Sequence, residues 1–190
     1  IEKSASTFVN SYRLTFDELR VPAENLIGEE GAGFYQVLDG LNEERLVIAA
    51  ELIGMAELAL SKGADYAADR EVFDQPIGAN QAIQHPLAAA HAEVQAARQV
   101  TYEAASRSAE DSLDRESLGA RANAAKYLAA NAASSAADAA VQAHGGKGIA
   151  LEYDVERYFR EARLSRLVPI AQELALNYIG ERELGLPRSY

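Results

Sequence analysis

Apolar and polar residues alternate in the first part of the chain. Tyr12, Leu14 and Phe16 are separated by polar residues, within a stretch that runs from residue 6 to residue 22. This period of two predicts one or two β-strands. Because two strands without further partners are only marginally stable, we expect them to belong to a sheet whose other strands precede Ile1.

The remainder of the chain has a helical period. A glycine-bearing loop over residues 25–33 precedes a first helix from Phe34 to about Arg70. Further helices are predicted over 81–110 with Pro86 in the first turn, over 115–144, and over 155–184 with a break at Pro169, joined by a loop at 71–80 and a polar connector at 111–114. Alanine dominates the third helix, and its small side chain lets neighbouring helices approach closely. The pattern predicts a mainly α fold, a four-helix bundle preceded by one or two β-strands.

Glu44 has an unusual place in the first helix. At about 100° per residue, four apolar residues project within roughly 60° of it, namely Val37, Leu41, Ile48 and Met55. An unpaired charge on such an apolar stripe is costly to bury. Glu44 therefore either pairs with a cation at the edge of the bundle, or has a raised pKa and a chemical role. Glu43 projects to the polar side and is predicted to be an ordinary solvated residue.

Three glycines, Gly145, Gly146 and Gly148, separate the third helix from the fourth. Glycines let a ligand approach the main chain closely, and they also tolerate the positive φ that a helix C-cap requires. The spacing leaves both interpretations open.

Composition narrows the possible functions. The 190 residues carry a net charge of -11 without a basic cluster, which argues against nucleic-acid binding. The chain has no cysteine, and its three histidines lack metal-ligand spacing. No run of eighteen apolar residues occurs, so we expect a soluble, cytoplasmic protein without membrane contact. Because the chain begins at Ile1, we expect it to be a fragment of a longer polypeptide.

Four separated motifs then resemble those of acyl-CoA dehydrogenases, in the same order along the chain. They are Leu14–Phe16 with Val21-Pro22 and Gly28-Glu29, Arg70–Ile77 with Gln81–Gln84, Gln142–Gly148, and Glu152-Tyr153 with Val155–Ala162. The resemblance implies that residues 1–32 are the tail of a middle β-domain with its linker, and that residues 33–190 form the C-terminal helical bundle.

The resemblance also implies a chemistry, the α,β-dehydrogenation of an acyl-CoA thioester with FAD. A carboxylate removes the α-proton while the β-hydrogen leaves as hydride to the flavin. In the commoner family type the base lies in a Tyr-Glu-Gly-Thr segment, which corresponds here to Val168–Ala171, so that Pro169 replaces the glutamate. In the isovaleryl type the base precedes the arginine of the first bundle helix. That position is Glu44, before Arg45.

Further site residues follow from the resemblance alone. Asn42 and Arg45 would line the substrate channel. FAD would be bound across a subunit interface by Arg70, Phe73, Gln81, Gln142 and the main chain of Ala143, His144, Gly145 and Gly146. Three residues depart from the family pattern, namely Asp74 for glycine, Ile149 for an aromatic residue, and Ala171 for a threonine that commonly touches FAD.

The resemblance implies an electron-transfer flavoprotein as electron acceptor and a homo-oligomer, either a dimer or a dimer of dimers. FAD is expected to be absent from this chain when it is isolated, because other parts of the protein supply walls of its site. Three other functions stay open. They are a non-catalytic subunit of a heteromeric acyl-CoA dehydrogenase, a related acyl-CoA oxidase or flavin monooxygenase, and a helical bundle that binds nothing.

Overall fold

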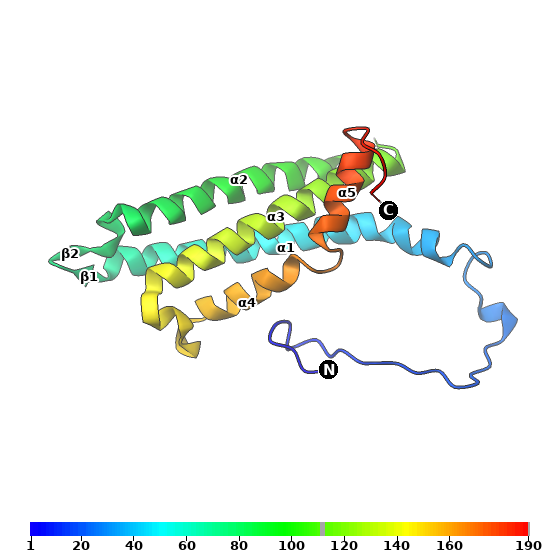
Figure 1. Cartoon of the computed structure of the whole chain (residues 1–190), viewed down its shortest axis with the longest axis horizontal. Helices are drawn as coiled ribbons and strands as arrows, with labels where there is room; N and C mark the ends of the chain where they lie inside the picture. The colour runs from blue at the N-terminus through cyan, green and yellow to red at the C-terminus, as the bar shows by residue number, and fades with distance from the viewer. Residues whose placement is uncertain (111–112, 190) are drawn as a thin grey trace.

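The computed structural model describes residues 1–110 and 113–189, apart from the side chains of Tyr35 and Asp39. The five helices are α1 Gly33–Asp69, α2 Gln81–Ala109, α3 Arg115–His144, α4 Val155–Ser165 and α5 Gln172–Arg182. The three long helices run side by side, with α2 antiparallel to α1 and α3 (Figure 1). The two shorter helices, α4 and α5, pack against α3. The predicted helical bundle is confirmed.

Local sequence explains where the helices begin and end. Asn80 caps α2 by accepting a hydrogen bond from the Ala82 amide at 3.2 Å, and Asp114 caps α3 by accepting from the Ser117 amide at 2.8 Å. The backbone hydrogen bond from Ser117 lowers the pKa of the Asp114 carboxyl group. At the other end, α3 stops at Gly145, whose φ of 59° favours a residue without a Cβ.

The core of the bundle is built around α3. Its buried hydrophobic residues are all alanines, from Ala120 to Ala143, and they face larger side chains such as Leu46, Ile53 and Val94 on α1 and α2. Because alanine adds little volume beyond the backbone, the three long helices can pack closely. No described helix combines the length and the apolar character needed to cross a membrane.

The connections contain short elements that the sequence pattern did not predict. Strands β1 Glu71–Val72 and β2 Gln75–Pro76 pair as an antiparallel hairpin, with Phe73 and Asp74 at its turn. Both turn residues have positive φ, 54° and 61°, as a two-residue hairpin of this kind requires. The 3-10 helices are η1 Ala23–Asn25, η2 Ile77–Ala79, η3 Gly145–Ile149 and η4 Leu151–Tyr153.

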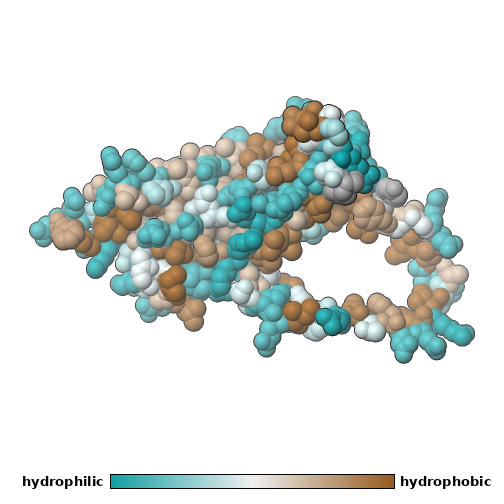
Figure 2. Space-filling model, viewed as in Figure 1, coloured by the Kyte–Doolittle hydropathy of each residue, from teal (hydrophilic) through white to brown (hydrophobic). Residues whose placement is uncertain are grey.

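The strands predicted between residues 6 and 22 are wrong for this structure. Residues 1–32 contain no strand; beyond residue 11 they form an extended arc outside the bundle (Figures 1 and 2). Tyr12, Leu14 and Phe16 are each more than 70% exposed. The alternation is real, but a strand needs a partner for its backbone donors and acceptors, and no neighbouring segment supplies one here.

Two predictions about helix limits can be compared with the structure. The break in the last helix is confirmed, because α4 ends at Ser165 and α5 begins at Gln172, on either side of Pro169. Pro86, however, is the sixth residue of α2 and lies in its second turn, where it forgoes one helical hydrogen bond. Residues 111 and 112 of the predicted polar connector lie outside the described residues.

Candidate functional site

A cavity of about 820 Å³, here called the Glu44 cavity, lies between α1, α4 and residues 6–9. Glu44 lines it together with Ile48, Leu52 and Met55 of the same helix. Two of the four apolar neighbours predicted for Glu44 thus line the cavity, whereas Leu41 does not and Val37 is 61% exposed. Leu164 contributes from α4. The cavity thus combines two carboxylates on α1, those of Glu44 and Glu51, with the apolar side chains between them.

Glu44 is exposed to this cavity and is not paired. Among the described residues none forms an ion pair with its carboxylate. The alternative in which Glu44 is a salt-bridged residue at the edge of the bundle is therefore not what the structure shows. Because Glu44 is exposed in this chain, the argument from a buried charge does not apply to it here. Glu43 is exposed as well.

The other position that can carry the base in acyl-CoA dehydrogenases corresponds to Pro169, and it lines the same cavity. Val168 and Pro169, in the turn between α4 and α5, line the Glu44 cavity. Proline has no group that can take up a proton. Of the two positions that could carry a base, only Glu44 has a carboxylate.

Asn42 and Arg45, which the resemblance places along the substrate channel, line a cavity other than the Glu44 cavity. Both are buried in a second cavity of about 530 Å³ between α1, α3 and α5, here called the Arg45 cavity. Arg45 Nη1 donates to Asn42 Oδ1 at 2.9 Å. Burial lowers the pKa of the Arg45 guanidinium, while the charge of Glu44 opposes this shift. The structure therefore places Asn42 and Arg45 in a cavity that Glu44 does not line.

Lys126 is a residue that sequence analysis did not single out. It is fully buried on α3, and its ammonium group donates to the Ile170 carbonyl at 2.7 Å. Burial, aided by the nearby charge of Arg45, lowers the pKa of Lys126 to about 8. The contact holds the turn that carries Pro169. Its signal in the sequence is a lysine on the face of the alanine-rich helix that includes Ala122, Ala129 and Ala133.

Three of the residues expected to bind FAD gather at the far end of the bundle. Arg70 caps α1, Phe73 lies at the tip of the β1–β2 hairpin, and Gln81 begins α2. All three side chains are exposed, Phe73 to 93%. A cation, an aromatic ring and an amide are thus presented together to whatever lies beyond this end.

The end of α3 reaches the same region. Gln142, Gly145 and Gly146 are exposed, and a Cβ added to either glycine would meet no heavy atom within 4 Å. His144 turns inward instead. Its ring stacks on Tyr66 with centroids 4.2 Å apart, and Nδ1 lies 2.8 Å from the Ala140 carbonyl. Ala143 is also buried, so neither of these two residues presents its side chain to solvent.

Glu44 lies far from the residues around Arg70 that are expected to bind FAD. Glu44 and Arg70 are on one continuous helix, and 26 residues at about 1.5 Å each separate them by roughly 39 Å. Glu44 and Arg70 therefore belong to separate regions of the bundle.

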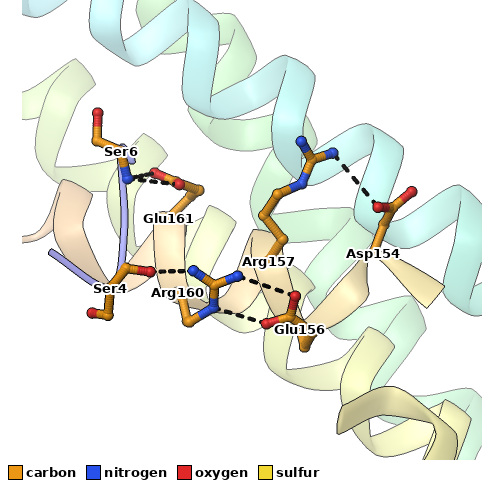
Figure 3. Close-up of polar contacts among 7 residues, drawn as sticks. All are labelled: Ser4, Ser6, Asp154, Glu156, Arg157, Arg160 and Glu161. Atoms are coloured by element: carbon orange, nitrogen blue, oxygen red, sulfur yellow. Dashed lines mark hydrogen bonds and ion pairs between the residues drawn. The ribbon is translucent and has the colours of Figure 1, made fainter. Parts of the chain in front are cut away.

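Residues 4–6 are attached to α4 by a set of polar contacts (Figure 3). The Ser6 amide donates to both carboxylate oxygens of Glu161, at 2.7 and 2.9 Å, and Arg160 donates to the Ser4 carbonyl. Arg160 also binds Glu156 through two hydrogen bonds of 2.8 and 3.1 Å. The hydrogen bond from Arg160 lowers the pKa of Glu156.

Comparisons with known proteins find relatives that resemble this chain in sequence and in fold. Acyl-CoA dehydrogenase FadE12 of Mycobacterium tuberculosis is 44% identical over 94% of this chain, which spans 46% of that protein. The solved structure of butyryl-CoA dehydrogenase from Megasphaera elsdenii superimposes with a TM-score of 0.82 and 34% identity, covering 89% of this chain and 43% of the other. A structure described as the electron transferring flavoprotein of Acidaminococcus fermentans has a TM-score of 0.82 and 32% identity over the same shares of the two chains.

The chain thus spans a little under half the length of the relatives it matches. Within the described residues, no group of three or more histidine and acidic side chains could hold a metal ion. The pattern that defines the C-terminal domain of acyl-CoA dehydrogenases matches residues 31–184. On this evidence the chain belongs to the acyl-CoA dehydrogenase family.

Proposed function

We propose that the full-length protein is an FAD-dependent acyl-CoA dehydrogenase in which Glu44 removes the α-proton of the thioester. The observation that carries this proposal is the Glu44 cavity. Both positions that can hold the base in the family line it, and only Glu44 offers a carboxylate. An acyl group with its apolar tail against Ile48, Leu52 and Met55 could bring its α-carbon to this carboxylate.

Glu44 is suited to this role in two respects. Its carboxylate has no cation attached among the described residues, so no ion pair has to break before it accepts a proton. In the full-length protein, substrate would also displace water from the cavity. A cavity without water keeps water from competing with the thioester for this carboxylate.

The residues at the far end of the bundle fit FAD. Arg70 is an exposed donor for a pyrophosphate, Phe73 an exposed ring, and Gly145 and Gly146 leave the main chain open to close approach. When bound, FAD accepts the β-hydrogen as hydride. Gln81 and Gln142 would add amide contacts, and Ala143 and His144 would contribute main-chain groups.

The separation between Glu44 and Arg70 supports an oligomer. We propose that Arg70 and its neighbours bind the flavin of a partner subunit, in a symmetric dimer or a dimer of dimers. Residues 1–32 would then belong to the middle β-domain and residues 33–190 to the bundle. An electron-transfer flavoprotein is the proposed electron acceptor, in line with the Acidaminococcus fermentans structure among the matches.

The test is an anaerobic panel of acyl-CoA thioesters mixed with the full-length protein. Bleaching of the oxidised flavin absorbance by at least one thioester is expected. A second measurement in air separates the possible acceptors, because an oxidase consumes oxygen in the presence of substrate whereas a dehydrogenase needs the flavoprotein. A full-length protein that binds no flavin, or whose flavin no thioester reduces, would rule the proposal out.

A further inference from the structure

The Glu44 cavity has a wall with few attachments of its own. Residues 6–9 form the side opposite α1, and within residues 1–32 only Ala5 is buried. Phe8 is 82% exposed and Val9 50%, although both line the cavity. Apolar packing therefore contributes little to holding this wall against the bundle.

Polar contacts hold it instead. Two consecutive residues of α4 bind two alternate residues of the segment, Arg160 through the Ser4 carbonyl and Glu161 through the Ser6 amide. The contacts enclose Ala5, which is 6% exposed. Figure 3 shows Glu161 and Arg160 side by side on α4, each directed at the segment.

Glu161 also selects the local conformation of the segment. Ser6 has a φ of 51°, a region that residues with a side chain rarely adopt. Both oxygens of the carboxylate lie within hydrogen-bond distance of its amide, and the Ser6 carbonyl accepts from the Val9 amide at 3.1 Å. A charged acceptor forms stronger hydrogen bonds than a neutral one. The turn that directs residues 6–9 along the cavity thus begins at the residue that Glu161 binds.

We propose that Arg160 and Glu161 are positioning residues that fix residues 4–9 as a wall of the acyl-binding cavity, and that this wall selects for large acyl groups. The inference rests on the proposed function. An acyl group long enough to cross the cavity from Glu44 would contact Phe8 and Val9, whereas a short one would not. Loss of the wall should weaken binding of large acyl groups and leave the chemistry at Glu44 intact.

The first experiment measures the wall without any substrate. Hydrogen exchange in the full-length protein reports on peptides from residues 1–11, with peptides from α2 as an internal reference. In Glu161→Ala, exchange in residues 4–9 is expected to be at least about tenfold faster than in the unmodified protein, because the Ser6 amide loses its acceptor. Glu161→Gln keeps one oxygen acceptor and should be intermediate.

Glu51→Gln is the matched control for this measurement. Glu51 lines the same cavity from α1 but has no hydrogen bond to residues 4–9. Its substitution should leave exchange in residues 4–9 unchanged. Unaltered exchange in α2 shows that a variant has folded. If Glu161→Ala folds and residues 4–9 exchange as slowly as before, Glu161 does not hold these residues in place and the proposal is overturned.

The second experiment measures selectivity over a straight-chain series from butyryl-CoA to palmitoyl-CoA. Glu161→Ala is expected to raise KM about tenfold for the largest acyl group accepted, with kcat and the KM for butyryl-CoA changed less than about twofold. Glu161→Gln should recover part of the lost affinity. Equal losses for short and long acyl groups would overturn the selectivity. If no thioester reduces the flavin of the unmodified protein, the proposed function fails. The exchange experiment still decides whether Glu161 holds residues 4–9 in place.

Discussion

At the scale of single residues, Glu44→Gln separates the shape of the cavity from its chemistry. The amide preserves size and helix propensity but cannot accept the α-proton. We expect the full-length variant to keep FAD and to bind acyl-CoA, while flavin reduction in a single turnover slows by at least about a hundredfold. Stopped-flow absorbance under anaerobic conditions measures this rate.

Glu43→Gln is the control for Glu44→Gln. Glu43 is exposed and does not line the Glu44 cavity, so its substitution should change the rate little. If Glu43→Gln slows the reduction and Glu44→Gln does not, the base is the neighbouring residue. If neither matters, the base lies elsewhere in the full-length protein, or the subunit is non-catalytic.

The lowered pKa of Lys126 predicts how the free energy of unfolding depends on pH. The pKa of Lys126 is about 8 in the folded chain, whereas in the unfolded chain it returns to its ordinary value of 10.5. Between these two pH values the unfolded chain therefore binds more protons than the folded chain. Stability therefore rises with pH through this window. Between pH 7 and pH 9.5, the unfolding free energy of the unmodified chain should rise by about 2 kcal/mol more than that of Lys126→Met. Urea denaturation at intervals of pH measures the difference, and parallel curves for the two proteins would contradict a buried, titrating Lys126.

At the scale of secondary-structure elements, the turn after α3 offers a matched pair of substitutions. A Cβ on Gly148 would lie 2.4 Å from the Val141 carbonyl oxygen, whereas one on Gly146 would meet nothing within 4 Å. We expect Gly148→Ala to destabilise the chain by about 1 to 3 kcal/mol, as overpacking usually does. Gly146→Ala should be nearly neutral. Thermal or urea unfolding of the two variants is the measurement, and similar stabilities would refute the close contact at Gly148.

The elements also show what the sequence can and cannot predict. The helices were predictable because alanine propensity, Asn80, Asp114 and Gly145 act locally. The strands over residues 6–22 were predicted wrongly because a strand depends on a partner that a local pattern does not contain. The β1–β2 hairpin was missed because its turn uses Phe73 and Asp74, which lack the glycine that usually marks such a turn.

For the candidate site, prediction succeeded where it depended on one helix. The helical period placed Glu44 beside Ile48 and Met55, as found. It could not show that Arg45, one residue further on, is buried in another cavity, because that depends on how α3 and α5 pack. The attachment of Glu161 to Ser6 joins residues 155 positions apart, which no local pattern reveals.

At the scale of the whole molecule, the distance between Glu44 and Arg70 can be tested by mixing subunits. If Arg70 serves the flavin of the partner, Glu44→Gln and Arg70→Ala should each be inactive alone. A dimer with one chain of each kind would contain one intact site. Random mixing should then restore about a quarter of the sites. Activity of co-expressed, separately tagged chains measures this, and a lack of recovery in isolated mixed dimers would place both residues at the same site.

The alanine core of α3 has a thermal consequence. Exposure of apolar surface raises the heat capacity on unfolding, whereas exposure of polar surface lowers it. Helices that pack through alanine bury much backbone and little side chain. The heat capacity change per residue should therefore fall below the usual range of about 12–15 cal/mol/K. Calorimetry at several pH values would measure it. A smaller change flattens the dependence of stability on temperature, so the bundle should lose little stability on cooling and should approach its melting temperature gradually.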